Sequence, residues 1–316
     1  MNFPIRRAGR VAFAFVAALA MTTAILPAQA EDGRIITVQS DLQKRADALL
    51  QGIGEGGGKV KYGAVEPGAT KDGIVIKDVE ITSPDNKTLK IERIEVRDFD
   101  WEHPKEPKRL DMSVKRLVIP ADALEKEAAD LGLTSLTVNA DFAYAIDEAK
   151  KTFEITGVAI DIVELGELKI KLKLAGVVLG DIKNAIGGEK KEGEKKEGDD
   201  GAMKALAQIA VVGASITFKD KSLVERMIRA DAKKKNISEA EAKQKMLEEL
   251  AEQKKKAEDD ATREVIDLAV KFLTKPGEIE ISANPAAPAN IMATFMALMG
   301  SPASVKDMLG LKLAVR

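Results

Sequence analysis

Four segments between residues 73 and 162 share one spacing of apolar side chains, at positions i, i+2, i+5 and i+7. These segments are residues 74–81, 89–96, 112–119 and 153–160. Alternation with period 2 predicts an extended strand that buries one face, and a single extra residue would move all later side chains to the other face. A β-bulge absorbs such a residue. The spacing therefore predicts a sheet of bulged strands whose apolar side chains share one face.

Simple alternation of apolar and polar residues predicts further strands. We expect them near residues 60–65, 136–146, 168–174, 212–218, 279–281 and 311–315. Turn-forming residues separate several of these segments, as in Ser83-Pro84-Asp85-Asn86-Lys87. Because such short turns join neighbours in space, the strands should form an antiparallel meander.

Helical spacing appears at both ends of the chain and after the predicted strand 212–218. We expect helices near residues 36–53, 123–130, 223–235, 239–274, 291–299 and 302–310. Ser222 with Glu225 and Ser238 with Glu241 both fit the capping-box pattern. The helix over 239–274 would be ~50 Å long. Its charged stripe is either a surface for a partner or simply the face in water.

These elements predict an α+β fold. It consists of an antiparallel, strongly twisted meander of bulged strands, packed against a long helical hairpin and short C-terminal helices. Residues 187–201 contain EKKEG twice and too few apolar residues to fold, so they predict a disordered charged loop. We expect residues 31–186 and 202–316, on either side of that loop, to complete one domain.

The first thirty residues have the features of an export signal. Arg6, Arg7 and Arg10 precede an apolar stretch over 11–26, and Ala28-Gln29-Ala30 fits a cleavage site. An uncleaved membrane anchor is the alternative, because sixteen apolar residues approach the length of a membrane span. The Arg6-Arg7 pair also allows export by the twin-arginine route, with general secretion as the default.

The amino-acid composition argues against several classes of function. Lys and Arg number 49 against 51 Asp and Glu, which argues against a nucleic-acid binder. The chain has no cysteine and a single histidine, His103, so we expect no catalytic residue, no metal site and no cofactor. The few aromatic residues argue against a sugar-binding platform. Residues 101–103, Trp-Glu-His, are either a polar lip at the end of the sheet or an ordinary connection.

Several of these features resemble uncharacterised exported proteins of Gram-negative bacteria. They are the export signal, the bulged-strand segment 73–81, the Leu131-Gly132-Leu133 link and the tail 302–311 with Met308-Leu309-Gly310-Leu311. The strand pattern more distantly resembles the AsmA-like envelope proteins, whose long sheets form an apolar groove. The resemblance implies a periplasmic protein of the cell envelope, and it carries over no functional residue.

The leading hypothesis is a non-enzymatic periplasmic protein that binds lipid or another hydrophobic molecule in an apolar groove of its sheet. Membrane contact at its surface and an envelope protein partner are further expectations. The predicted groove residues are Ile76, Val79, Ile91, Ile94, Val114, Leu117, Phe142, Phe153, Ile155 and Met296. The same residues could instead fill an ordinary core. The second hypothesis is a structural or adaptor protein of the envelope that acts through helices within 223–274.

Overall fold

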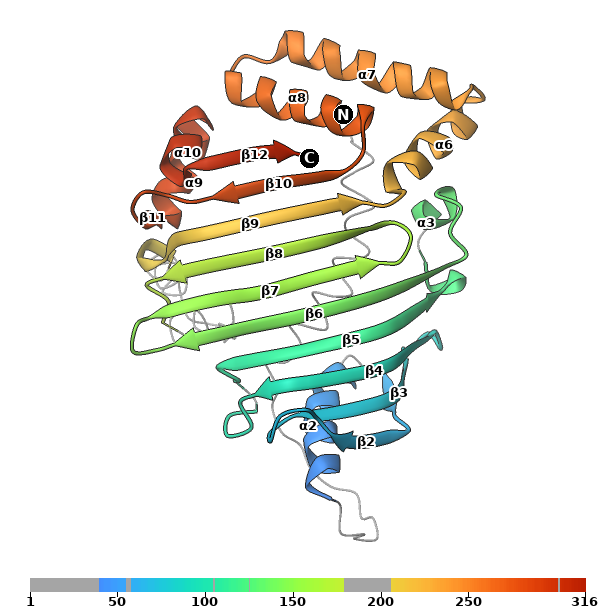
Figure 1. Ribbon diagram of the computed structural model, residues 1–316, viewed down its shortest axis with the longest axis vertical. Helices are drawn as coiled ribbons and strands as arrows, with labels where there is room; N and C mark the ends of the chain where they lie inside the picture. Colours follow the sequence, from blue (N-terminus) through green and yellow to red (C-terminus); the bar gives the residue numbers. More distant parts are fainter. Residues whose placement is uncertain (1–39, 55–57, 105, 125, 179–205, 301) are drawn as a thin grey trace, which may run out of the picture. The chain divides into compact units, whose positions relative to one another are not determined.

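A computed structural model describes residues 40–54, 58–104, 106–124, 126–178, 206–300 and 302–316 (Figure 1). The predicted signal peptide 1–30 and the predicted charged loop 187–201 lie outside these residues. The chain divides into two compact units. Unit 1 comprises Met1–Ala143 with Ala159–Leu165, and unit 2 comprises Tyr144–Val158 with Gly166–Arg316. The fold is α+β with antiparallel strand pairing, as the hydrophobic pattern predicts.

The described part of unit 1 contains one long helix, two short helical turns and the first strands. Its elements are α2 (Asp41–Gly54), β1 (Lys59–Lys61), β2 (Ala64–Pro67), β3 (Ile74–Thr82), β4 (Thr88–Phe99), β5 (Arg109–Pro120), η1 (Ala121–Ala123) and α3 (Lys126–Asp130). The strand order is β1-β3-β4-β5, and β2 also pairs with β3. The predicted first strand over 60–65 is two strands, broken at Tyr62 and Gly63. Strands β6 (Ser135–Asp147) and β7 (Thr152–Ile162) contribute residues to both units.

Unit 2 combines the later strands with a helical region. Its elements are β8 (Gly166–Ala175), β9 (Ala210–Asp220), α6 (Leu223–Lys235), α7 (Glu239–Lys256), α8 (Asp260–Thr274), β10 (Glu278–Ala283), β11 (Ala289–Asn290), α9 (Ile291–Gly300), α10 (Pro302–Leu309) and β12 (Leu311–Val315). The strand order is β8-β9-β10-β12, with β11 paired to β9. Figure 1 shows α7 and α8 side by side, with α8 next to β12.

The extra residues of β3, β4 and β5 lie opposite one another. Asp78 in β3 and Arg116 in β5 adopt left-handed φ angles of 53° and 51°, and Glu92 is the extra residue of β4 between them. The register continues unchanged on both sides of this row. The pairs that flank it are Ile76 with Ile94, Val79 with Ile91, Ile94 with Val114, and Ile91 with Leu117. The predicted shared apolar face is therefore confirmed for these three strands.

That face is the core of unit 1. Its most deeply buried side chains, each at most 1% exposed, are Ile74, Ile76, Val79, Ile91, Ile94 and Val96. Helix α2 contacts β1, β2 and β3 and contributes Ala46, Leu49 and Leu50, which are 0–5% exposed. Each isoleucine buried in this way stabilises the fold by ~1.5–3 kcal/mol. Ser40 caps the start of α2, because its Oγ accepts a hydrogen bond from Gln43 N–H at 3.3 Å.

The predicted single helix over 239–274 is wrong, because the chain forms α7 and α8 instead. The Asp259 carboxylate accepts hydrogen bonds from Thr262 N–H at 2.8 Å and from Thr262 Oγ1 at 2.7 Å, which starts a new helix there. The capping box of Ser238 and Glu241 at the start of α7 is confirmed.

The other predicted capping box, at the start of α6, is absent. Ser222 makes no side-chain cap there. The Asp220 carboxylate accepts from Val224 N–H at 3.0 Å instead. The helix begins where the pattern predicts, but its cap comes from the end of the preceding strand.

Candidate functional site

Six of the ten predicted groove residues lie together in the core of unit 1. They are Ile76, Val79, Ile91, Ile94, Val114 and Leu117, which are 0–5% exposed. They come from three adjacent strands and face one another across the register described above. Because protein atoms enclose these side chains, they present no open surface to a ligand in this conformation.

The other four predicted residues are more accessible. Phe142 in β6 is partly buried, and so are Phe153 and Ile155 in β7. The Phe153 ring lies 6.0 Å from the ring of Tyr144. Met296 lies on α9 and is 67% exposed, so this helix does not fill a core.

Unit 2 carries an apolar sheet face that the candidate residues did not include. Paired residues of antiparallel strands point to the same side of a sheet, so the register defines this face. Its three rows cross β8, β9, β10 and β12 in that order. They are Leu168, Phe218, Ile279 and Val315; Ile170, Ile216, Ile281 and Leu313; and Leu172, Ala214, Ala283 and Leu311. We call these twelve residues the open apolar face.

The open apolar face differs from the core of unit 1 in its exposure. Every one of its twelve side chains is partly or largely open to solvent. The two residues at the centre of the middle row, Ile216 and Ile281, are 47% and 40% exposed. Scattered exposed apolar residues are ordinary, but a contiguous apolar surface marks a site of contact with another molecule. The open apolar face is therefore the candidate contact site of unit 2.

Helix α8 borders the open apolar face at one end. The Phe272 ring of α8 packs edge-on against Phe218 of the first row, with 6.1 Å between ring centroids. The reverse side of the same strands is polar and includes Lys169, Lys171 and Thr217. In the sequence, the alternating lysines of β8 predicted that one side of this sheet is polar and the other apolar. They did not predict that the apolar side is exposed to solvent.

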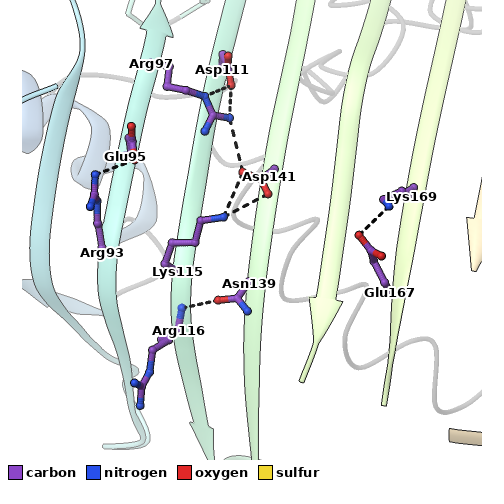
Figure 2. A network of polar contacts seen from close by, with 10 residues as sticks. All are labelled: Arg93, Glu95, Arg97, Asp111, Lys115, Arg116, Asn139, Asp141, Glu167 and Lys169. Carbon is purple, nitrogen blue, oxygen red and sulfur yellow. Dashed lines mark hydrogen bonds and ion pairs between the residues drawn. The ribbon is translucent and has the colours of Figure 1, made fainter. Parts of the chain in front are cut away.

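Charged side chains form a network on the polar side of β4, β5 and β6 in unit 1 (Figure 2). Arg97 donates to Asp111 Oδ1 from Nε at 2.9 Å and from Nη2 at 2.5 Å. Asp141 lies 3.6 Å from Arg97 Nη2 and 3.4 Å from Lys115 Nζ. The hydrogen bond to Asp111 raises the pKa of the Arg97 guanidinium. Both signs of charge are paired here, so the network joins strands and offers no unbalanced charge to a ligand.

The segment predicted as a polar lip or a connection holds α2 in place. Trp101 Nε1 donates to the backbone oxygen of Asp72 at 2.8 Å, and its ring lies 4.5 Å from that of Phe99. The Arg45 guanidinium of α2 lies over the Trp101 ring at 5.1 Å and donates to the same Asp72 oxygen at 3.2 Å. These contacts of Phe99, Trp101, Asp72 and Arg45 have a structural role, and we call them the corner at Trp101.

Next to Trp101, three side chains approach the geometry of a metal site. Asp100, Glu102 and His103 each place one ligand atom within 4.8 Å of the others. The buried Asp100 carboxylate already accepts from Lys108 N–H at 3.1 Å and lies 3.3 Å from His103 Nδ1. Burial raises the pKa of Asp100, but these two contacts together with the charge of Arg109 outweigh it and hold that pKa below its usual value. The carboxylate therefore has a structural role in this loop, and Glu102 is exposed to solvent.

Comparison with protein families matches the second half of the chain. A family model described as "Uncharacterized protein" covers residues 159–315, which includes most of unit 2 and the whole open apolar face. Among curated proteins, none matches the chain. Within the residues that the structure describes, no helix combines the length and apolar character needed to cross a membrane.

Proposed function

We propose that the protein is a non-enzymatic protein of the periplasm that binds lipid or another hydrophobic molecule on its open apolar face. The observation that carries the proposal is the exposure of Ile216 and Ile281 at the centre of three unbroken apolar rows. Assignment to the periplasm depends on the export signal between Arg6 and Ala30. A role in maintaining the envelope belongs to the same proposal.

The size of the open apolar face indicates the class of ligand. Side chains on one face recur every ~6.8 Å along a strand, and strands lie ~4.8 Å apart. Three rows over four strands therefore span ~14 Å in each direction. A single acyl chain laid across the face would cover its middle row. The ligand is accordingly an aliphatic chain whose polar end extends beyond the rows.

The helical region supports this arrangement. The contact between Phe272 and Phe218 favours α8 as a partial cover for the face. The adaptor function through helices within 223–274 has less support, because charges on these helices pair with one another. Arg229 bonds to Glu225 and Glu239, and Lys254 bonds to Asp267.

Binding of a fluorescent long-chain fatty acid to the purified full chain tests the proposal. Full burial of an isoleucine stabilises by ~1.5–3 kcal/mol. Ile216 and Ile281 are each nearly half exposed, so nearly half of this energy remains to be gained when a ligand covers them. Replacing both, Ile216→Ser with Ile281→Ser, should remove about 2 kcal/mol of binding energy, which weakens binding about 30-fold. The matched control is Val163→Ser in the turn after β7, which is 40% exposed, lies outside the open apolar face and should stay within about twofold of the wild type.

Native mass spectrometry of protein extracted from cells provides an independent measurement. The wild type should carry a lipid that the double variant lacks, with both proteins equally folded by circular dichroism. Equal affinity of wild type and double variant for the fatty acid would contradict the proposal, as would wild-type protein that binds no fatty acid.

A further inference from the structure

Helix α9 is the most exposed apolar element of the residues that the structure describes. Phe295, Met296, Leu298 and Met299 are 58%, 67%, 53% and 78% exposed. At 3.6 residues per turn, these four side chains cover an arc of about 160° around the helix. In Figure 1, α9 lies with α10 at one end of the strands of unit 2, beside β11. Water thus surrounds a large part of an apolar helix.

Three polar groups at the start of α9 are hydrogen-bonded within the protein. Thr294, its only polar side chain, donates to the backbone oxygen of Asn290 at 2.8 Å. Asn290 Oδ1 accepts from Ala293 N–H at 2.9 Å, and Ile291 N–H donates to the backbone oxygen of Ile209 at 3.0 Å. A segment that enters hydrocarbon must satisfy its polar groups in this internal way.

The sequence around α9 is also without charge. Residues 281–305 contain no Asp, Glu, Lys, Arg or His, in a chain of which 32% is charged. The first charged residue after this stretch, Lys306, is bonded to Glu264 of α8. Neither a salt bridge with a protein partner nor repulsion from a hydrocarbon phase is therefore expected at this surface.

We propose that α9 inserts into the surface of a lipid bilayer and anchors the protein there. A helix that docks in a protein groove buries one apolar stripe and keeps a polar remainder. By contrast, the wide apolar arc of α9 and the uncharged sequence around it suit the boundary between headgroups and acyl chains. The helix is ~15 Å long, so it lies in one leaflet and does not span the bilayer. This surface differs from the open apolar face, and the inference stands without the proposed function.

Flotation of the full chain with phosphatidylcholine vesicles tests the inference. Replacing Met296→Ser together with Met299→Ser should lower vesicle partitioning at least about 30-fold, because both side chains are mostly exposed. The control Val265→Ser, at a position 53% exposed on α8, should leave partitioning unchanged. Because residues 281–305 are uncharged, binding should be equally strong on neutral and anionic vesicles and should persist at high salt.

A second readout locates insertion at α9 itself. The chain has no cysteine, so Met299→Cys offers a unique position for an environment-sensitive dye. Vesicles should shift the emission of this dye to the blue and leave a dye at Val265→Cys unchanged. Residues 11–26 are also apolar, and the dye separates insertion of α9 from any contact they make.

Three results would overturn the inference. They are an unshifted dye at position 299, binding that requires anionic lipid, and a double serine variant that dissociates a dimer while leaving vesicle binding intact. The last result would assign α9 to a contact between copies of the chain.

Discussion

The corner at Trp101 allows a quantitative test of how α2 is held on the sheet of unit 1. Replacing Arg45→Ala removes three contacts at once. They are the stacking on Trp101 at 5.1 Å, the hydrogen bond to the Asp72 backbone oxygen at 3.2 Å and the ion pair with the Asp72 carboxylate at 3.8 Å. The Arg45 side chain is 30% exposed, so each contact is weaker than its fully buried equivalent.

The magnitude follows from these contacts. A partly exposed cation–π contact contributes about 0.5–1 kcal/mol, and a hydrogen bond from a charged group about 1.5 kcal/mol. An ion pair at this distance and exposure adds little. We expect Arg45→Ala to lower the free energy of unfolding by about 2 kcal/mol, after allowance for solvent exposure. Arg45→Lys should lose about half of that, because lysine keeps the charge but not the planar stacking group.

Urea unfolding followed by tryptophan fluorescence measures this change. Trp101 is the only tryptophan of the chain, so its emission reports on this corner directly. The control is Lys44→Ala on the same helix, whose weak ion pair with Asp41 is largely exposed and should contribute less than about 0.5 kcal/mol. If Arg45→Ala and Lys44→Ala unfold at the same urea concentration, the corner does not hold α2 and the reasoning is refuted.

Two further predictions concern the core and one titrating group. Ile94→Ala should destabilise the protein by about 2–5 kcal/mol, whereas Ile281→Ala on the open apolar face should cost clearly less, because Ile94 is fully buried and Ile281 is 40% exposed. Equal losses in urea unfolding by circular dichroism would contradict the assigned exposures. Burial, with the hydrogen bond that Tyr62 donates to Asp47 at 2.7 Å, raises the pKa of Tyr62 to about 12. Its contribution to stability is therefore complete below the ordinary pKa near 10 and is lost as the pH rises toward 12. Ultraviolet titration should show a late tyrosinate step that Tyr62→Phe abolishes and Tyr144→Phe retains.

The strands were predictable because their signal is local. The period-2 pattern and the single extra residue per strand identified β3, β4 and β5, and β3 has the bounds expected from its turn residues. The break between α7 and α8 was not evident from the sequence. Asp259 lies in a charged stretch, where an acidic residue is normally interpreted as part of the solvent-exposed face of a helix. Its capping hydrogen bond to Thr262 is visible only in the structure.

The exposed site was harder to predict than the strands. Ile76 and Ile216 occupy equivalent places in alternating patterns, yet Ile76 is fully buried and Ile216 is 47% exposed. What covers a sheet face depends on contacts between distant segments, such as those of α2 with β3, and no local pattern encodes them. The pairing of β10 with β12, which completes the open apolar face, also skips the intervening β11, α9 and α10.

The aligned row of Asp78, Glu92 and Arg116 has a consequence for how this sheet can change over evolution. Each extra residue is accommodated because the neighbouring strand has one at the same level. A deletion in one strand would leave its neighbour's additional residue facing a gap and displace the pairing beyond it. Insertions and deletions at this level should therefore be inherited jointly by all three strands, while the hairpin loops between them are free to vary in length.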